Sequence, residues 1–125
     1  MSDDYTITQE DHFLRVVFHA RPTIESAQAL IHELQNSHNY IRRLWDLSQI
    51  PFDFDLKEIV DTASYGRKVF EQPSLAAFLV SDKEAYEKLR QVYAFRSDDL
   101  LKTGVFIDIE DARNWFATQS LPGAE

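Results

Sequence analysis

The sequence contains no cysteine, only three glycines and only four prolines. Without cysteine, the chain has no disulfides, no thiolate metal ligands and no thiol nucleophiles. Phosphate and dinucleotide sites commonly use a glycine-rich loop that opens a helix, and no such loop surrounds Gly66, Gly104 or Gly123. The four histidines also lack the spacing typical of metal ligands. We therefore expect no cofactor and no metal.

Long apolar runs are also missing, since the longest one covers only residues 75–80. The net charge of −8 and the pI near 4.9 disfavour binding to a phosphate backbone or to an anionic membrane surface. Residues 1–4 are acidic, and no apolar stretch of signal-peptide type follows them. We expect a cytoplasmic protein with no nucleic-acid partner and no membrane insertion.

What is present is the pattern of a single α/β domain. The 125 residues are 44% hydrophobic, which is enough for one core. β-rich runs alternate with helical periodicity in the order β-β-α-β-α-β-α-β-α. This order predicts a mostly parallel sheet with an antiparallel first strand, over one domain, 1–125, with flexible ends at 1–4 and 119–125. The expected strands are 5–9, 13–18, 41–47, 75–80 and 104–107.

Helix starts are marked by capping residues. Asp55 with Glu58, and Ser81 with Glu84, have the spacing of a capping box. Asp108 precedes the last helical segment as a further N-cap. These signals separate the helices from the strands before them.

The stretch 44–56 holds the densest mixture of polar and aromatic residues, and it joins the central strand to the second helix. In open α/β sheets, ligands gather outside the carboxyl ends of the strands, where this stretch is expected to lie. The candidate interaction residues are Asp46, Ser48, Phe52, Asp53, Phe54 and Asp55. The acidic ones are typical either of a cation or acid–base site, or of helix caps and backbone hydrogen bonds. The two phenylalanines either plug the core or form an exposed apolar patch.

The segment 43–52, Arg-Leu-Trp-Asp-Leu-Ser-Gln-Ile-Pro-Phe, resembles the STAS fold of anti-sigma-factor antagonists, and in particular its SpoIIAA-like branch of small bacterial proteins. The later segments 77–82 and 105–115 fit the same branch, the last with an acidic-Ala-x-x-Trp helix. The chain is similar, more distantly, to the Sec14-type lipid-binding fold. The resemblance implies a single STAS-like domain that acts through protein–protein contacts.

One feature of that family is missing. In its phosphorylated members, a serine at the helix start accepts the phosphate. Residues 54–57 here read Phe-Asp-Leu-Lys, and no serine or threonine lies between 49 and 61. The resemblance therefore implies a module that is not switched by serine phosphorylation at this position. Asp55 either mimics the charge of a phosphoserine or simply caps the helix.

The resemblance and the lack of a catalytic set together predict a non-enzymatic protein-interaction or regulatory module with no catalytic residues. It would act through the loop 48–56 and the exposed face of the following helix. The alternative is a carrier of a small apolar, lipid-like ligand, with Phe52 and Phe54 lining a pocket. An enzyme using Asp46 and Asp53 is the third hypothesis. The terminal strand at 5–9 leaves an edge that a second copy could pair with, so a homodimer is a further possibility.

Overall fold

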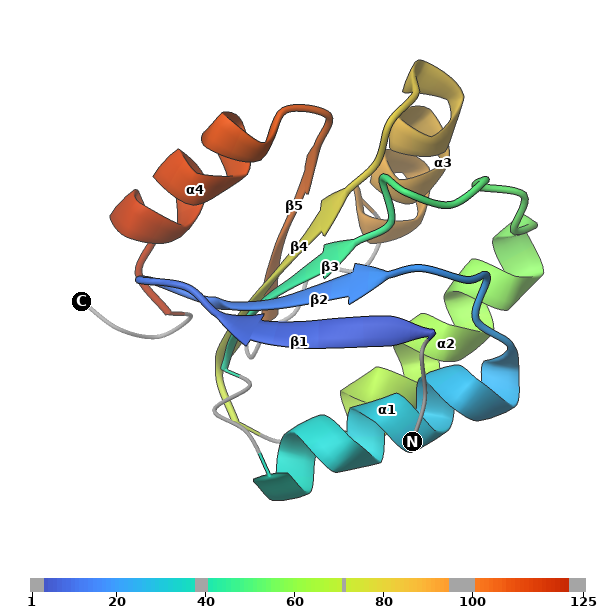
Figure 1. The fold of residues 1–125 in the computed structure, drawn as a ribbon, viewed down its shortest axis with the longest axis horizontal. Helices are drawn as coiled ribbons and strands as arrows, with labels where there is room; N and C mark the ends of the chain where they lie inside the picture. The colour runs from blue at the N-terminus through green and yellow to red at the C-terminus, as the bar shows by residue number, and fades with distance from the viewer. Residues whose placement is uncertain (1–3, 38–40, 71, 95–100, 122–125) are drawn as a thin grey trace.

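A computed structural model describes residues 4–37, 41–70, 72–94 and 101–121, and it shows a sheet with helices on both sides (Figure 1). The strands are β1 (Tyr5–Gln9), β2 (Leu14–Phe18), β3 (Arg42–Asp46), β4 (Ser74–Leu79) and β5 (Leu101–Phe106). The helices are α1 (Ile24–Ser37), α2 (Leu56–Val69), α3 (Lys83–Ala94) and α4 (Ile109–Thr118). The predicted order of elements and the α/β class are confirmed.

The five strands lie in the order β1-β2-β3-β4-β5. β1 pairs antiparallel with β2, and every later pair is parallel, as predicted from the short first connection. Each parallel connection contains one helix, which is what a crossover between neighbouring parallel strands requires. The spatial order follows the chain order without reversal, so these strands contain no switch point of the kind that commonly places ligands at a strand edge.

Alternation along the strands divides the core between the two sides of the sheet. On one side, here called the three-helix face, Val16 and Trp45 belong to a cluster with residues of α1, α2 and α3. On the other side, here called the α4 face, Leu44 and Ala77 pack with Phe116 of α4. Figure 1 shows α4 alone on its side, with α1 and α2 together on the opposite side. The helices are therefore distributed three to one over the two faces.

The predicted caps are confirmed at two helices and wrong at a third. At α2, Glu58 N donates to Asp55 Oδ1 over 2.8 Å, and Asp55 N donates to Glu58 Oε1 over 3.1 Å, which completes the capping box. At α4, Asp108 Oδ1 accepts from the backbone N–H of Glu110. At α3 the cap is not Ser81 but Asp82, whose carboxylate accepts from Ala85 N over 2.8 Å. The carboxylate is the stronger acceptor, and it lies one residue closer to the helix.

The last strand begins earlier than predicted, at Leu101 rather than Gly104, because residues 101–103 continue the ladder opposite Ser74–Ala76. The predicted flexible ends lie partly outside the described residues. Of the described part, Leu121 packs against the cluster on the α4 face. Among the residues that the structure describes, no helix is both long and apolar enough to span a membrane.

Candidate functional site

An apolar cavity of about 150 Å³ lies on the three-helix face, between the sheet and the helices. Its floor consists of alternate residues of the two central strands, namely Arg43, Trp45, Ser74, Ala76 and Phe78. These residues share one side of the sheet because successive side chains of a strand point to opposite faces. Residues of α1, α2 and α3 form the opposite wall.

Incomplete closure of the helices over the sheet creates this space. Trp45 lies on a central strand and faces the helix layer, yet it stays half-exposed. Phe78, its partner in the β3–β4 register, is half-exposed as well. Large aromatic rings in the middle of the sheet are therefore left partly uncovered.

The loop between β3 and α2 forms one end of the cavity. Phe52 and Phe54 are half-buried and line the cavity, whereas Asp53 and Asp55 between and after them are exposed. The two rings meet edge to face with their centroids 5.1 Å apart. Both phenylalanines pack against the core cluster of the three-helix face. The structure therefore favours the interpretation in which Phe52 and Phe54 pack inward over the one in which they form an exposed apolar patch.

Arg21, just after β2, ties this loop to α2. Its Nε donates to Asp53 Oδ1 over 2.5 Å, and its Nη2 lies 3.1 Å from Glu58 Oε2. The guanidinium also lies over the ring of Phe54, 4.4 Å from the centroid. The hydrogen bond from Arg21 holds the pKa of Asp53 below its usual value. Arg21, Asp53 and Glu58, here called the Arg21 clasp, hold the loop beside the cavity.

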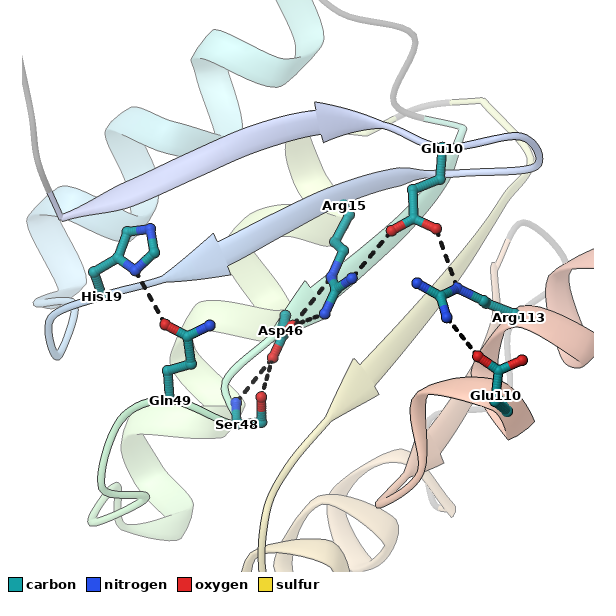
Figure 2. A network of polar contacts seen from close by, with 8 residues as sticks. All are labelled: Glu10, Arg15, His19, Asp46, Ser48, Gln49, Glu110 and Arg113. Carbon is teal, nitrogen blue, oxygen red and sulfur yellow. Dashed lines mark hydrogen bonds and ion pairs between the residues drawn. The ribbon is translucent and has the colours of Figure 1, made fainter.

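Asp46 lies on the other side of the sheet, in the network of Figure 2. Its side chain is completely buried, and its Oδ2 accepts from Arg15 Nη2 over 2.7 Å and from Arg15 Nε over 3.1 Å. Its Oδ1 accepts from the backbone N–H and the hydroxyl of Ser48. Glu10 joins Arg15 to Arg113 of α4. The Asp46 carboxylate closes the loop after β3, and the network as a whole links β2, β3 and α4.

The six predicted site residues therefore separate into two groups. Asp46 and Ser48 belong to the network on the α4 face. Phe52 and Phe54 line the cavity, Asp53 between them belongs to the Arg21 clasp, and Asp55 caps α2. Asp46 and Asp53 bind different arginines on opposite faces, so the structure does not bring them together as an acid–base pair.

Sequence reasoning missed Arg43, although the pattern of the strand contained a signal. Arg43 is only 4% exposed, and its guanidinium lies over the ring of Phe70, 4.1 Å from the centroid. It alternates with Trp45 and Leu47, so it occupies the apolar side of a central strand. An arginine at such a position is uncommon, because buried charges require compensation.

The described residues contain no group of three histidine, aspartate or glutamate side chains that could hold a metal ion. His19 makes a hydrogen bond to Thr6 over 2.8 Å. A second one joins it to Gln49 over 3.2 Å (Figure 2). No family model matches the chain, and neither a curated protein nor a solved structure is significantly similar to it. The resemblance to the STAS fold therefore stays a prediction.

Proposed function

We propose that this protein binds a small apolar ligand in the cavity of the three-helix face, without catalysing a reaction. The observation that supports this most strongly is Trp45, a half-exposed aromatic side chain on a central strand beneath a helix layer. Protein interiors are normally packed to the density of organic crystals, so an unfilled apolar space beside such a ring is costly. A ligand that fills the space restores the missing contacts and removes apolar surface from water.

The size of the cavity limits the ligand. A cavity of about 150 Å³ has the same size as an engineered apolar cavity that holds benzene. The exposed walls at Thr23 and Ile24 leave it open to solvent, so a longer ligand can extend outward. Phe52 and Phe54 offer aromatic contacts at this end. A compact apolar body with a short extension fits these dimensions.

Ala76→Leu tests the proposal directly. Ala76 is 2% exposed on the cavity floor, so a leucine there occupies the space that the ligand needs. We expect 1-octanol to bind the wild-type protein in calorimetric titration, and the variant to bind at least about tenfold more weakly. Ala117→Leu, on the exposed side of α4, is the matched control and should bind like wild type.

Two results would contradict the proposal. One is a wild-type protein that binds no apolar probe and carries no small molecule in native mass spectra after purification from its own cells. The other is an Ala76→Leu protein that shows the circular dichroism and melting temperature of a folded chain and binds 1-octanol unchanged.

A protein-interaction module of STAS type is the second candidate. It is supported by exposed groups beside the loop, namely Asp53, whose side chain is 62% exposed, and Leu56, which is 42% exposed. Co-purification with the double variant Phe52→Ala/Phe54→Ala and with Ala76→Leu separates the two candidates. A partner held by the loop is lost only with the double variant, because Ala76→Leu leaves the surface intact. Equal recovery of every partner with both variants would remove this candidate.

A further inference from the structure

Aromatic side chains border the cavity from three directions. Trp45 and Phe78 belong to its floor. Phe52 and Phe54 come from the loop after β3, and Tyr93 comes from α3. Each of these residues is only half-buried, so each keeps side-chain surface that the rest of the protein does not cover. A molecule in the cavity therefore meets mostly aromatic surface on the floor and at the loop.

Part of the helical wall opposite the floor consists of very small side chains. Ala27 of α1 lines the cavity there, together with Ala63 and Gly66 of α2. None of these residues carries more than a methyl group, so the wall leaves room above the large rings of the floor. The unfilled space thus lies where a further ring would have rings as neighbours.

Aromatic rings attract one another in a way that saturated groups do not reproduce. The face of a ring is negative and its edge is positive, so a second ring pairs with it either edge to face or in an offset stack. The lining already contains both geometries, because Phe78 stacks on Tyr93 with centroids 4.8 Å apart and Phe52 meets Phe54 edge to face. A planar ring that enters the cavity extends these pairs, whichever part of each ring it meets.

We infer that the ligand is a monocyclic aromatic compound. Its ring lies against Trp45 and Phe78, and its substituent leaves the cavity beside Ile24, which is 40% exposed. One ring matches a cavity of about 150 Å³, since an engineered cavity of this volume binds benzene. This inference rests on the proposed function, because it names the chemical class of the ligand that the same cavity binds.

Three alcohols with the same number of carbon atoms test the inference, namely 2-phenylethanol, 2-cyclohexylethanol and 1-octanol. Each is titrated into the wild-type protein at neutral pH by calorimetry. The aromatic alcohol is the most soluble in water, so apolar transfer alone favours the two saturated ones. We nevertheless expect 2-phenylethanol to bind at least about threefold more tightly than 2-cyclohexylethanol, because only its ring pairs with the rings of the lining.

Trp45→Leu removes the largest ring of the floor and keeps an apolar side chain there. The quantity compared is the dissociation constant of 2-cyclohexylethanol divided by that of 2-phenylethanol, and we expect the variant to lower it at least about twofold. Tyr86→Leu is the matched control, because it removes a half-buried ring of α3 that lies outside the lining of the cavity. It should keep the wild-type ratio.

The outcomes separate this inference from the proposed function. If none of the three alcohols binds, the proposed function is wrong and the inference falls with it. If 1-octanol binds and 2-cyclohexylethanol binds at least as tightly as 2-phenylethanol, the cavity accepts apolar ligands and only the inference is overturned. A ratio that is unchanged in folded Trp45→Leu, or that falls equally in Tyr86→Leu, would overturn it as well. The comparison of the alcohols in the wild-type protein stays decisive even if Trp45→Leu fails to fold.

Discussion

A buried charge has different surroundings on the two faces of strand β3. Asp46, on the α4 face, is fully buried and holds Arg15 and Ser48 with both of its carboxylate oxygens. Arg43, three residues earlier on the three-helix face, borders an apolar cavity and stacks on Phe70. The first arrangement is an internal network that links β2, β3 and α4. The second lies in the lining of the cavity.

The aromatic packing differs in the same direction. On the α4 face, Phe13 and Phe116 stack with centroids 4.4 Å apart, and both are almost completely buried. On the three-helix face, Trp45 and Phe78 are only half-buried although they lie on central strands, whereas the half-buried aromatic residues of the α4 face, Phe106 and Trp115, lie on the edge strand β5 and on α4. Filled packing is typical of a structural core, and an unfilled apolar cavity is typical of a binding site. We therefore assign recognition to the three-helix face, which also holds the larger group of buried hydrophobic residues, and the buried ion-pair network to the α4 face.

Asp46→Ala should produce the largest effect on stability. The substitution removes the carboxylate between Arg15 and Ser48 and leaves the arginine without its buried partner. We expect the free energy of unfolding to fall by about 3 kcal/mol, as is common when one member of a buried ion pair is removed. Denaturation with urea measures it.

Asp53→Ala is the control for that experiment, because Asp53 also pairs with an arginine but its side chain is 62% exposed. Its effect on the free energy of unfolding should stay within about 1 kcal/mol. If both substitutions lower the free energy of unfolding by the same amount, the buried network of the α4 face has no special structural role. The comparison between the faces is then wrong.

Replacing a glycine by alanine should change the free energy of unfolding in opposite directions on the two faces. A Cβ on Gly104, on the α4 face, would lie 2.7 Å from Phe106 Cε2 and 3.2 Å from Trp115 Cε2. A Cβ on Gly66, beside the cavity, would lie 3.7 Å from Ile31 Cδ1, which is an ordinary contact. We expect Gly104→Ala to lower the free energy of unfolding by about 1–2 kcal/mol and Gly66→Ala to raise it by about 0.5–1 kcal/mol. Changes of the same sign in urea denaturation would contradict this difference.

The smallest expected effect is the pH dependence of stability that comes from the Arg21 clasp. Because Arg21 holds the pKa of Asp53 below its usual value of 3.8, the ionised carboxylate favours the closed loop. The contribution is therefore complete above pH 3.8 and is lost as the pH falls through the lower pKa of the folded state. The side-chain carboxyl resonance of Asp53 should show this low pKa in wild type and a normal one in Arg21→Gln. A normal pKa in both proteins would mean that the clasp does not hold the loop in solution.

Much of the fold followed from local signals. Alternating β-rich and helical segments predicted the order of elements, and the short first connection predicted the antiparallel strand. Asp55 and Asp108 marked helix starts correctly, because a cap depends on residues within one turn. The prediction of Ser81 as a cap was wrong because the neighbouring Asp82 offers the backbone of the first turn a stronger acceptor.

The site was only half predictable. Two of the candidate residues in the stretch 44–56, Phe52 and Phe54, line the cavity. However, the cavity is lined by residues of β3, β4, α1, α2 and α3, and which of these side chains meet depends on packing between segments far apart in the chain. Arg43 was missed because a charge near a strand start is usually solvated, and only the observed register shows that it is buried.

The two tryptophans test the central claim in one spectrum, because Trp45 borders the cavity and Trp115 lies on the α4 face. The measurement is a titration of ¹⁵N-labelled protein with 1-octanol, in which the two indole N–H resonances are assigned from Trp45→Phe and Trp115→Phe. Ligand binding in the cavity predicts that the Trp45 resonance shifts to saturation while the Trp115 resonance stays in place. An unchanged Trp45 resonance at saturating 1-octanol, or equal shifts of both resonances, would contradict the account.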